Sequence, residues 1–185
     1  MTMKRRENLS FWQWLLKGSG ASPGYQRYIN IWIVLHFCVG FVLSNLVQAD
    51  LVDAANAVSL PLVGIFLGSF AWARNAHALL LSREIEEIAD FHEGGFAEYV
   101  FVYQGALFAI FLTLIIWGLA SLGVFTHTWP TPTRRLSYSA IEVVLYALLS
   151  LALRECWHIV QGTHWMLLAQ REIKRAKKIR SAKTP

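Results

Sequence analysis

The chain has 185 residues, of which 55% are hydrophobic and 16% are charged, and its formal net charge is +5. A soluble globular domain is typically about 45–50% apolar and about 25% charged. The composition therefore excludes an ordinary soluble domain of this length and indicates an integral membrane protein.

Four apolar segments approach the length of about 20 residues that an α-helix needs to cross the hydrocarbon core of a bilayer. Such lengths are typical of helices and not of barrel strands, which need about 10 residues of alternating polarity. We therefore expect an all-α integral membrane protein with four transmembrane helices. The four segments are residues 28–47, 57–73, 99–123 and 138–153.

The N-terminal residues 1–24 hold one short apolar patch, FWQWLL, at residues 11–16. The patch is shorter than the apolar region of a signal peptide, and we expect a short amphipathic helix that lies in the inner membrane interface. Residues 25–169 are expected to form the four-helix transmembrane bundle. Residues 170–185 are expected to form the basic cytosolic end of the last helix.

Basic residues lie mostly on one side of the predicted spans. All but two of the 17 Lys and Arg residues precede the first span or follow the second and fourth, and the exceptions are Arg134 and Arg135. The positive-inside rule then places both termini in the cytoplasm. We expect a multi-pass protein of the bacterial inner membrane.

Two short segments resemble each other, HALLLSREI at residues 77–85 and HWMLLAQREI at residues 164–173. Each follows an even-numbered span, which predicts two helical hairpins in a possible parallel repeat. No Pro and no paired Gly interrupts residues 138–180. We therefore expect helices 2 and 4 to extend beyond the membrane and to form a cytosolic stalk.

The two copies of Arg-Glu-Ile in this repeat are followed by opposite charges. We expect the acidic inner hairpin to pack beside the basic C-terminal helix, with apolar contacts such as Ile85 with Ile173. The alternative is a basic tail that binds anionic lipid, while binding to nucleic acid is the least favoured interpretation. The stalk residues are Glu86, Glu87, Asp90, Lys174, Arg175 and Lys178.

Small residues recur at steps of three and four along the second and third spans. Small side chains let helix backbones approach closely within a bilayer. One interpretation is ordinary packing within one bundle, and the other is that one stripe closes the protomer while the other forms a homo-oligomer. The residues are Gly64, Gly68, Ala71, Gly105, Ala109 and Gly123.

Two histidines raise the possibility of haem b. His77 and His164 occupy corresponding places in the repeat, so a pseudo-twofold axis would aim both imidazoles at one iron. The alternative is that both are interfacial or solvated. A di-metal carboxylate site needs two Glu-x-x-His pairs, and only Glu155 with His158 fits, so no metal is expected. Haem b apart, no cofactor is expected.

Polar side chains on the last span suggest a pore or a sensor. Glu142 lies inside the outer boundary, and Arg154, His158 and Gln161 share one helix face at i, i+4 and i+7. They would line an inner vestibule if copies assembled around an axis, but they fit a solvated face equally well. The ordinary interpretation of Glu142 is a snorkelling or paired acid.

No enzyme is expected, because the sequence holds no HExxH, GxSxG, GxxxxGK[ST] or CxxC motif. We expect a non-enzymatic, oligomeric inner-membrane protein whose cytosolic stalk anchors or senses for a soluble protein partner. Its build is analogous to that of membrane components of bacterial defence. The alternatives are an oligomeric ion channel or pore and a b-type haem membrane cytochrome.

Overall fold

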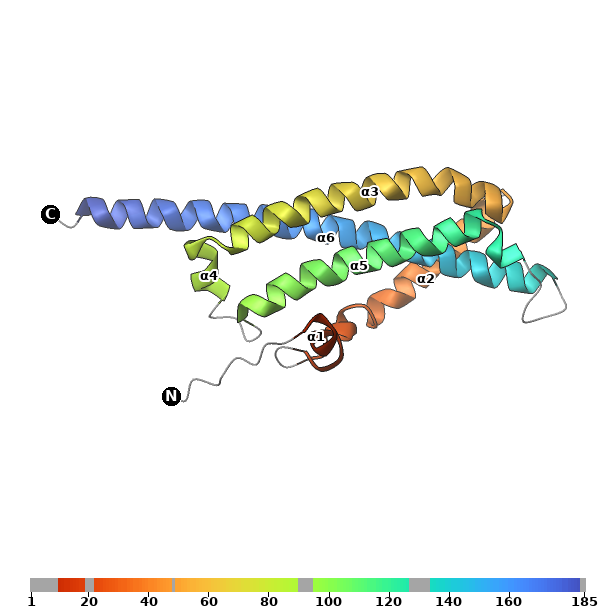
Figure 1. Cartoon of the computed structure of the whole chain (residues 1–185), viewed down its shortest axis with the longest axis horizontal. Helices are drawn as coiled ribbons and strands as arrows, with labels where there is room; N and C mark the ends of the chain where they lie inside the picture. The colour runs from red at the N-terminus through yellow and green to blue at the C-terminus, as the bar shows by residue number, and fades with distance from the viewer. Residues whose placement is uncertain (1–9, 19–21, 48, 90–94, 127–133, 184–185) are drawn as a thin grey trace.

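The computed structural model describes residues 10–18, 22–47, 49–89, 95–126 and 134–183, and all the regular elements in these ranges are helices (Figure 1). Three of them are long and apolar enough to cross a membrane: α3 (Leu51–Leu80), α5 (Gly95–Ser121) and α6 (Arg134–Lys183). The prediction of an all-helical chain with apolar, membrane-type helices is confirmed.

The first expected span is shorter than the sequence predicted. α2 (Ile31–Leu46) has 16 residues and is about 24 Å long, which is less than the hydrocarbon thickness of about 30 Å. It begins at Ile31 because Asn30 is extended and its side chain accepts a hydrogen bond from the Trp32 amide at 2.9 Å. The short 3₁₀ helix η1 (Gly24–Arg27) lies before this cap.

The second and fourth apolar segments form longer helices than their apolar runs. α3 begins at Leu51, six residues before the expected start, and carries Pro61 in its interior. α6 runs unbroken for 50 residues, as the absence of helix-breaking residues predicted, and is about 75 Å long. The expected division of the chain between residues 169 and 170 therefore falls inside one helix. A short helix, α4 (Arg83–Ala89), follows α3.

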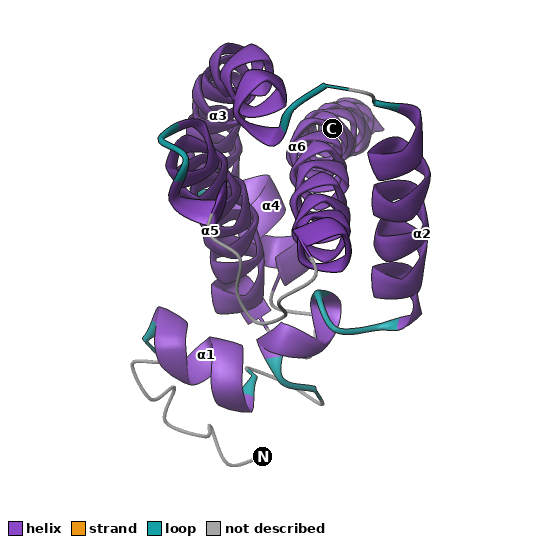
Figure 2. Cartoon of the chain, turned by 90° about the vertical axis from the view of Figure 1, so that its right-hand side faces the viewer, coloured by secondary structure: helices purple, strands orange, loops and turns teal. Residues whose placement is uncertain are grey.

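The helices α2, α3, α4 and α5 all pack against α6, which lies between α2 and the α3–α5 pair (Figure 2). Side chains fix α5 against α6: the Trp117 indole N–H donates to the Leu145 carbonyl at 3.1 Å, and the Thr113 hydroxyl reaches the Leu148 carbonyl at 3.4 Å. On the other side, His36 Nδ1 of α2 lies 2.9 Å from Ser150 Oγ. Such interhelical hydrogen bonds supply association energy that apolar burial does not provide in lipid.

Many large apolar side chains point away from the protein. Among the most exposed are Ile31 at 82%, Leu60 at 79% and Leu46 at 71%. A soluble monomer seldom exposes so much contiguous apolar surface, whereas lipid solvates it at no cost. The exposed apolar surface therefore agrees with the membrane interpretation.

The N-terminal helix α1 (Phe11–Lys17) packs on the chain and does not lie wholly in the interface as expected. Trp14 is buried, and its indole N–H donates to Glu98 Oε2 of α5 at 2.7 Å. Trp12 and Leu16 remain exposed. The helix therefore has one face against α5 and another that is free to contact lipid.

Two of the predicted small-residue contacts do not form within this chain. A Cβ added at Gly64 or Gly68 would meet nothing within 4 Å, and Ala71 is also exposed. For these residues, the interpretation of ordinary packing inside one bundle is wrong, because they lie on the face of α3 that points away from α5 and α6. Their role in an oligomer stays a prediction.

The remaining small residues have different surroundings. Gly105 is buried on α5, where a Cβ would collide with the Tyr28 hydroxyl, and Ala109 is half-buried. Gly123 lies after the end of α5 with φ of 75°, a conformation that glycine adopts without strain. Its backbone conformation therefore suits the end of the helix.

The backbones of α2 and α6 approach closely at Gly40. A Cβ there would collide with the Val143 carbonyl oxygen and lie 2.9 Å from the Ala147 amide nitrogen. The substitution Gly40→Leu is therefore expected to lower the free energy of unfolding by about 1–3 kcal/mol or more through overpacking. Thermal unfolding of the purified protein in detergent, followed by circular dichroism, measures this loss.

The matched control is Gly118→Leu on α5, where a Cβ would meet nothing within 4 Å. It introduces the same side chain into another helix interior and is expected to leave the melting temperature nearly unchanged. Equal melting temperatures for the two variants would show that α2 and α6 do not approach at Gly40.

Candidate functional site

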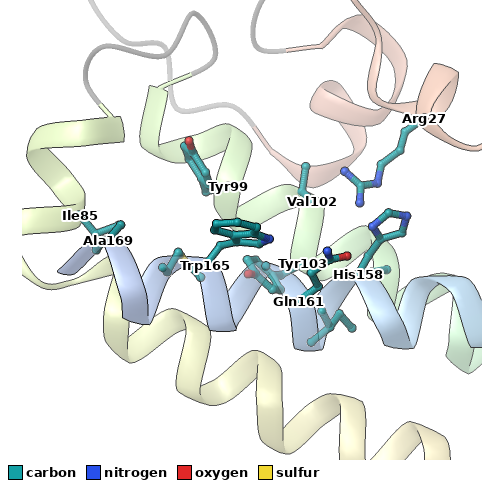
Figure 3. A pocket seen from close by; sticks show the side chains of 13 residues that line it. Arg27, Ile85, Tyr99, Val102, Tyr103, His158, Gln161, Trp165 and Ala169 are labelled. Atoms are coloured by element: carbon teal, nitrogen blue, oxygen red, sulfur yellow. The ribbon is translucent and has the colours of Figure 1, made fainter. Parts of the chain in front are cut away.

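A pocket of about 560 Å³ lies between η1, α5 and α6, with α4 at one end (Figure 3). Its lining is mainly apolar and aromatic, which is typical of pockets that bind small molecules. The wall residues are Arg27 from η1, Ile85 from α4, Tyr99, Val102, Tyr103 and Ala106 from α5, and His158, Ile159, Gln161, Gly162, Trp165, Met166 and Ala169 from α6.

Helical periodicity brings these residues to one wall. The α6 residues recur at steps of three and four, which places them on one helix face, and the α5 residues do the same on the facing helix. The Tyr103 side chain reaches across to α6, where a Cβ at Gly162 would lie only 2.6 Å from its hydroxyl. The glycine therefore leaves room for the phenol that forms part of the pocket wall.

A buried ion cluster lies beside the pocket. The Glu155 side chain is fully buried, with Oε2 at 3.9 Å from Arg27 Nε and Oε1 at 3.7 Å from Arg154 Nη1. Burying a charge is costly unless it is paired. The two guanidinium groups neutralise the carboxylate and leave the cluster with a net charge of +1.

The cluster has hydrogen-bonding capacity that the protein does not use. Buried polar atoms without a hydrogen-bond partner include both carboxylate oxygens of Glu155, Arg27 Nε, Arg154 Nη1 and the Tyr28 hydroxyl. Buried polar groups are normally satisfied by protein or ordered water. This concentration of unsatisfied atoms distinguishes the cluster from an ordinary structural salt bridge.

His158 connects the cluster to the pocket. Arg154 Nε donates to His158 Nε2 at 3.2 Å, so this ring nitrogen acts as an acceptor and the imidazole is neutral with its proton on Nδ1. Figure 3 shows the His158 ring and the Arg27 guanidinium close together at one end of the pocket. That end therefore presents mainly hydrogen-bond donors.

The four candidate pore residues do not share one environment. His158 and Gln161 line the pocket within a single chain, whereas Arg154 is directed to Glu155. Glu142 is half-buried near the other end of α6. The structure thus brings His158 and Gln161 together with Arg27, which the sequence analysis used only as an indicator of orientation.

The two candidate haem ligands have unlike surroundings. His77 is half-buried on α3, with its ring centroid 6.4 Å from that of Tyr103, while His164 is exposed on α6. A bis-histidine haem needs both imidazoles directed at one buried iron, so these residues do not fit the group. In the part of the chain that the structure describes, no group of three or more His, Cys, Asp or Glu residues is arranged to hold a metal ion.

The predicted stalk residues lie where α4 meets α6. Glu87 Oε2 lies 3.4 Å from Lys177 Nζ, and its other oxygen lies 3.3 Å from Arg83 Nε. Ile85 is buried and Ile173 is half-buried. Asp90 lies outside the described residues, and the other predicted stalk residues are exposed: Glu86, Lys174, Arg175 and Lys178.

Sequence reasoning missed the central residue of the cluster, although a signal was present. Ala152, Glu155, Ile159, Thr163 and Met166 follow helical spacing, and all five are buried. An acid in register with this apolar face predicts a buried carboxylate that needs a cationic partner. The sequence analysis considered Glu155 only as a metal ligand together with His158 and did not predict its burial.

Comparison of this chain with models of known protein families, with curated proteins and with solved structures gave no match.

The ion cluster predicts coupling between η1 and α6. Glu155→Gln leaves Arg27 and Arg154 beside each other without a counter-charge, and Arg27→Gln removes one of the two cations around a buried carboxylate. Each variant is expected to be less stable than the parent, because removing one partner of a buried ion pair leaves an uncompensated buried charge. The double variant is expected to recover about 1–3 kcal/mol relative to the sum of the two losses.

Chemical or thermal unfolding of the four proteins in one detergent measures this double-mutant cycle. Additive losses would show that Arg27 and Glu155 do not interact in the folded protein.

Proposed function

We propose that this protein is a non-enzymatic anchor of the bacterial inner membrane whose cytosolic stalk binds a soluble protein. In this proposal α3, α5 and α6 cross the bilayer, the shorter α2 does so with local thinning of the bilayer, and both termini are cytoplasmic. The stalk consists of α4 and the C-terminal part of α6. The observation that carries the proposal is the extension of α6 beyond the other helices (Figure 1).

Among the described residues, α4 covers one face of the α6 extension. Lys177 pairs with Glu87 of α4, and Ile173 is half-buried on the same side. The positions Arg171, Arg175 and Lys178 are related by i, i+4 and i+7, so they share the opposite face, and all three are exposed. α4 therefore leaves a basic face of the stalk open.

This open face also carries an apolar side chain, Ile179, which is 57% exposed. Apolar side chains at the centre of an interface supply much of its affinity, and charges around them steer association. An acidic protein surface with a small apolar depression would complement it. The open face thus favours a protein partner over a purely solvated helix.

The outward face of α3 supports the oligomeric part of the proposal. Gly64, Gly68 and Ala71 are exposed and follow one another at steps of four and three. Small residues in hydrocarbon permit close helix packing, and we propose that two copies meet there. We favour an anchor over an ion channel, because His158 and Gln161 line a pocket within one chain and not a vestibule between copies.

Site-specific photo-crosslinking in cells tests the stalk surface. A benzophenone amino acid at Ile179 is expected to give one adduct of discrete mass with a cytosolic protein. Arg175→Glu in the same protein is expected to reduce this adduct severalfold, because each exposed ion pair contributes up to about 1 kcal/mol and charge reversal adds repulsion. Immunoblotting and mass spectrometry identify the adduct.

The control is Arg180→Glu, which makes the same charge change on the side of α6 that carries Ile173 and Lys177, opposite the face of Arg171, Arg175 and Lys178. It is expected to leave the adduct largely intact. Adducts that contain only lipid or only a second copy of the chain would refute the partner-binding function.

A further inference from the structure

We propose that the pocket between η1, α5 and α6 binds a small organic anion with an apolar body. The charged group of this ligand is a carboxylate or phosphate held at the Arg27–His158 end. This inference does not rest on the proposed function, because it concerns the pocket and not the open face of α6. It rests on the donors at one end of the pocket, on the net charge beside them and on the apolar remainder of the wall.

The first argument is the excess of donors. Arg27 carries five N–H donors and no acceptor, and its Nε lies 3.9 Å from Glu155, too far for a hydrogen bond. The His158 Nε2 already accepts from Arg154, so the Nδ1–H of that ring is the donor that remains. Planar or tetrahedral anions match such donors, and a guanidinium binds them with two parallel hydrogen bonds.

The second argument is the charge. The aromatic rings of Tyr99, Tyr103 and Trp165 at the pocket are residues that also form cages for organic cations. A cation would need Glu155 as its counter-charge, but that carboxylate already lies between two guanidinium groups at 3.7 and 3.9 Å. The net charge of +1 therefore disfavours a cation and favours an anion.

The third argument is the shape and chemistry of the remaining wall. Away from Arg27 the pocket is bounded by Trp165, Met166, Ile85 and Ala169, as Figure 3 shows for its labelled residues. Burial of an apolar body against such side chains contributes roughly 25 cal/mol per Å². A volume of about 560 Å³ lies within the range of pockets for drug-sized ligands.

Such an anion has two possible sources. It can be a membrane lipid with one free acidic group that enters from the inner leaflet, or a water-soluble aromatic or aliphatic acid from the cytosol. Both present the same chemistry to Arg27 and His158. The experiment therefore first tests whether binding needs the anionic group as well as the apolar body. It then identifies the source of the ligand.

The test uses two photoreactive probes that differ only in the headgroup, a diazirine dodecanoic acid and the corresponding diazirine dodecanol. The full-length protein is placed in nanodiscs of neutral phosphatidylcholine, irradiated with each probe, digested and mapped by mass spectrometry. The acid is expected to label the peptides that contain Val102 and Trp165 severalfold more than the alcohol does. Equal labelling by acid and alcohol would overturn the proposal.

Two variants test the residues. Arg27→Gln is expected to remove the excess labelling by the acid and to leave the weak labelling by the alcohol. Val102→Trp fills the pocket without changing any charge of the ion cluster, and it is expected to remove site-specific labelling by the acid as well. Arg74→Gln, which removes an exposed arginine on α3, is the control and is expected to change nothing. Unchanged labelling in both test variants would overturn the proposal.

Competition identifies the source. Displacement of the acid probe by phosphatidic acid in the nanodisc indicates a lipid ligand, and displacement by water-soluble 4-phenylbutyrate indicates a cytosolic acid. Either result supports the anion site. Failure of both competitors to reduce labelling at Val102 and Trp165 would contradict it.

Discussion

The single uninterrupted helix α6 is the constraint on which the rest of the structure depends. α2, α3, α4 and α5 all pack against it. In hydrocarbon, backbone groups are satisfied within the helix, so side chains must set the position of each neighbour. Trp117 and Thr113 do so through the Leu145 and Leu148 carbonyls, and His36 does so through Ser150. A break in α6 would disconnect the bundle from the stalk.

The buried Glu155 gives α6 a second role, because it ties the N-terminal segment to the bundle. Its carboxylate attracts Arg27 from η1, and Trp14 and Tyr28 pack over Gly105 nearby. Such a cluster is weak evidence for stability, since an apolar core of the same volume would often serve as well. What it provides is position: Arg27 is held at the wall of the pocket, where a flexible surface arginine would not remain.

Periodicity and composition were enough to predict the helices, and the absence of Pro and paired Gly predicted the continuity of α6. They were not enough to predict which helix face meets protein and which meets lipid, because both environments are apolar. Gly64 and Gly68 were therefore grouped with Gly105, although only Gly105 packs within the chain. The N-cap at Asn30, which makes α2 begin at Ile31 and so shortens it, was also not predicted. The pocket depends on tertiary contacts between η1, α5 and α6, which a single sequence does not report.

A distance measurement along α6 tests the central claim most directly. Spin labels at Val144→Cys and Ser181→Cys, in a protein whose Cys38 and Cys156 are replaced by Ser, lie 37 residues apart on one helix. Double electron–electron resonance in nanodiscs is predicted to give one narrow distribution near 55 Å, from a rise of about 1.5 Å per residue. A broad distribution, or one centred well below this value, would show that the helix bends or ends at the membrane and would contradict the account.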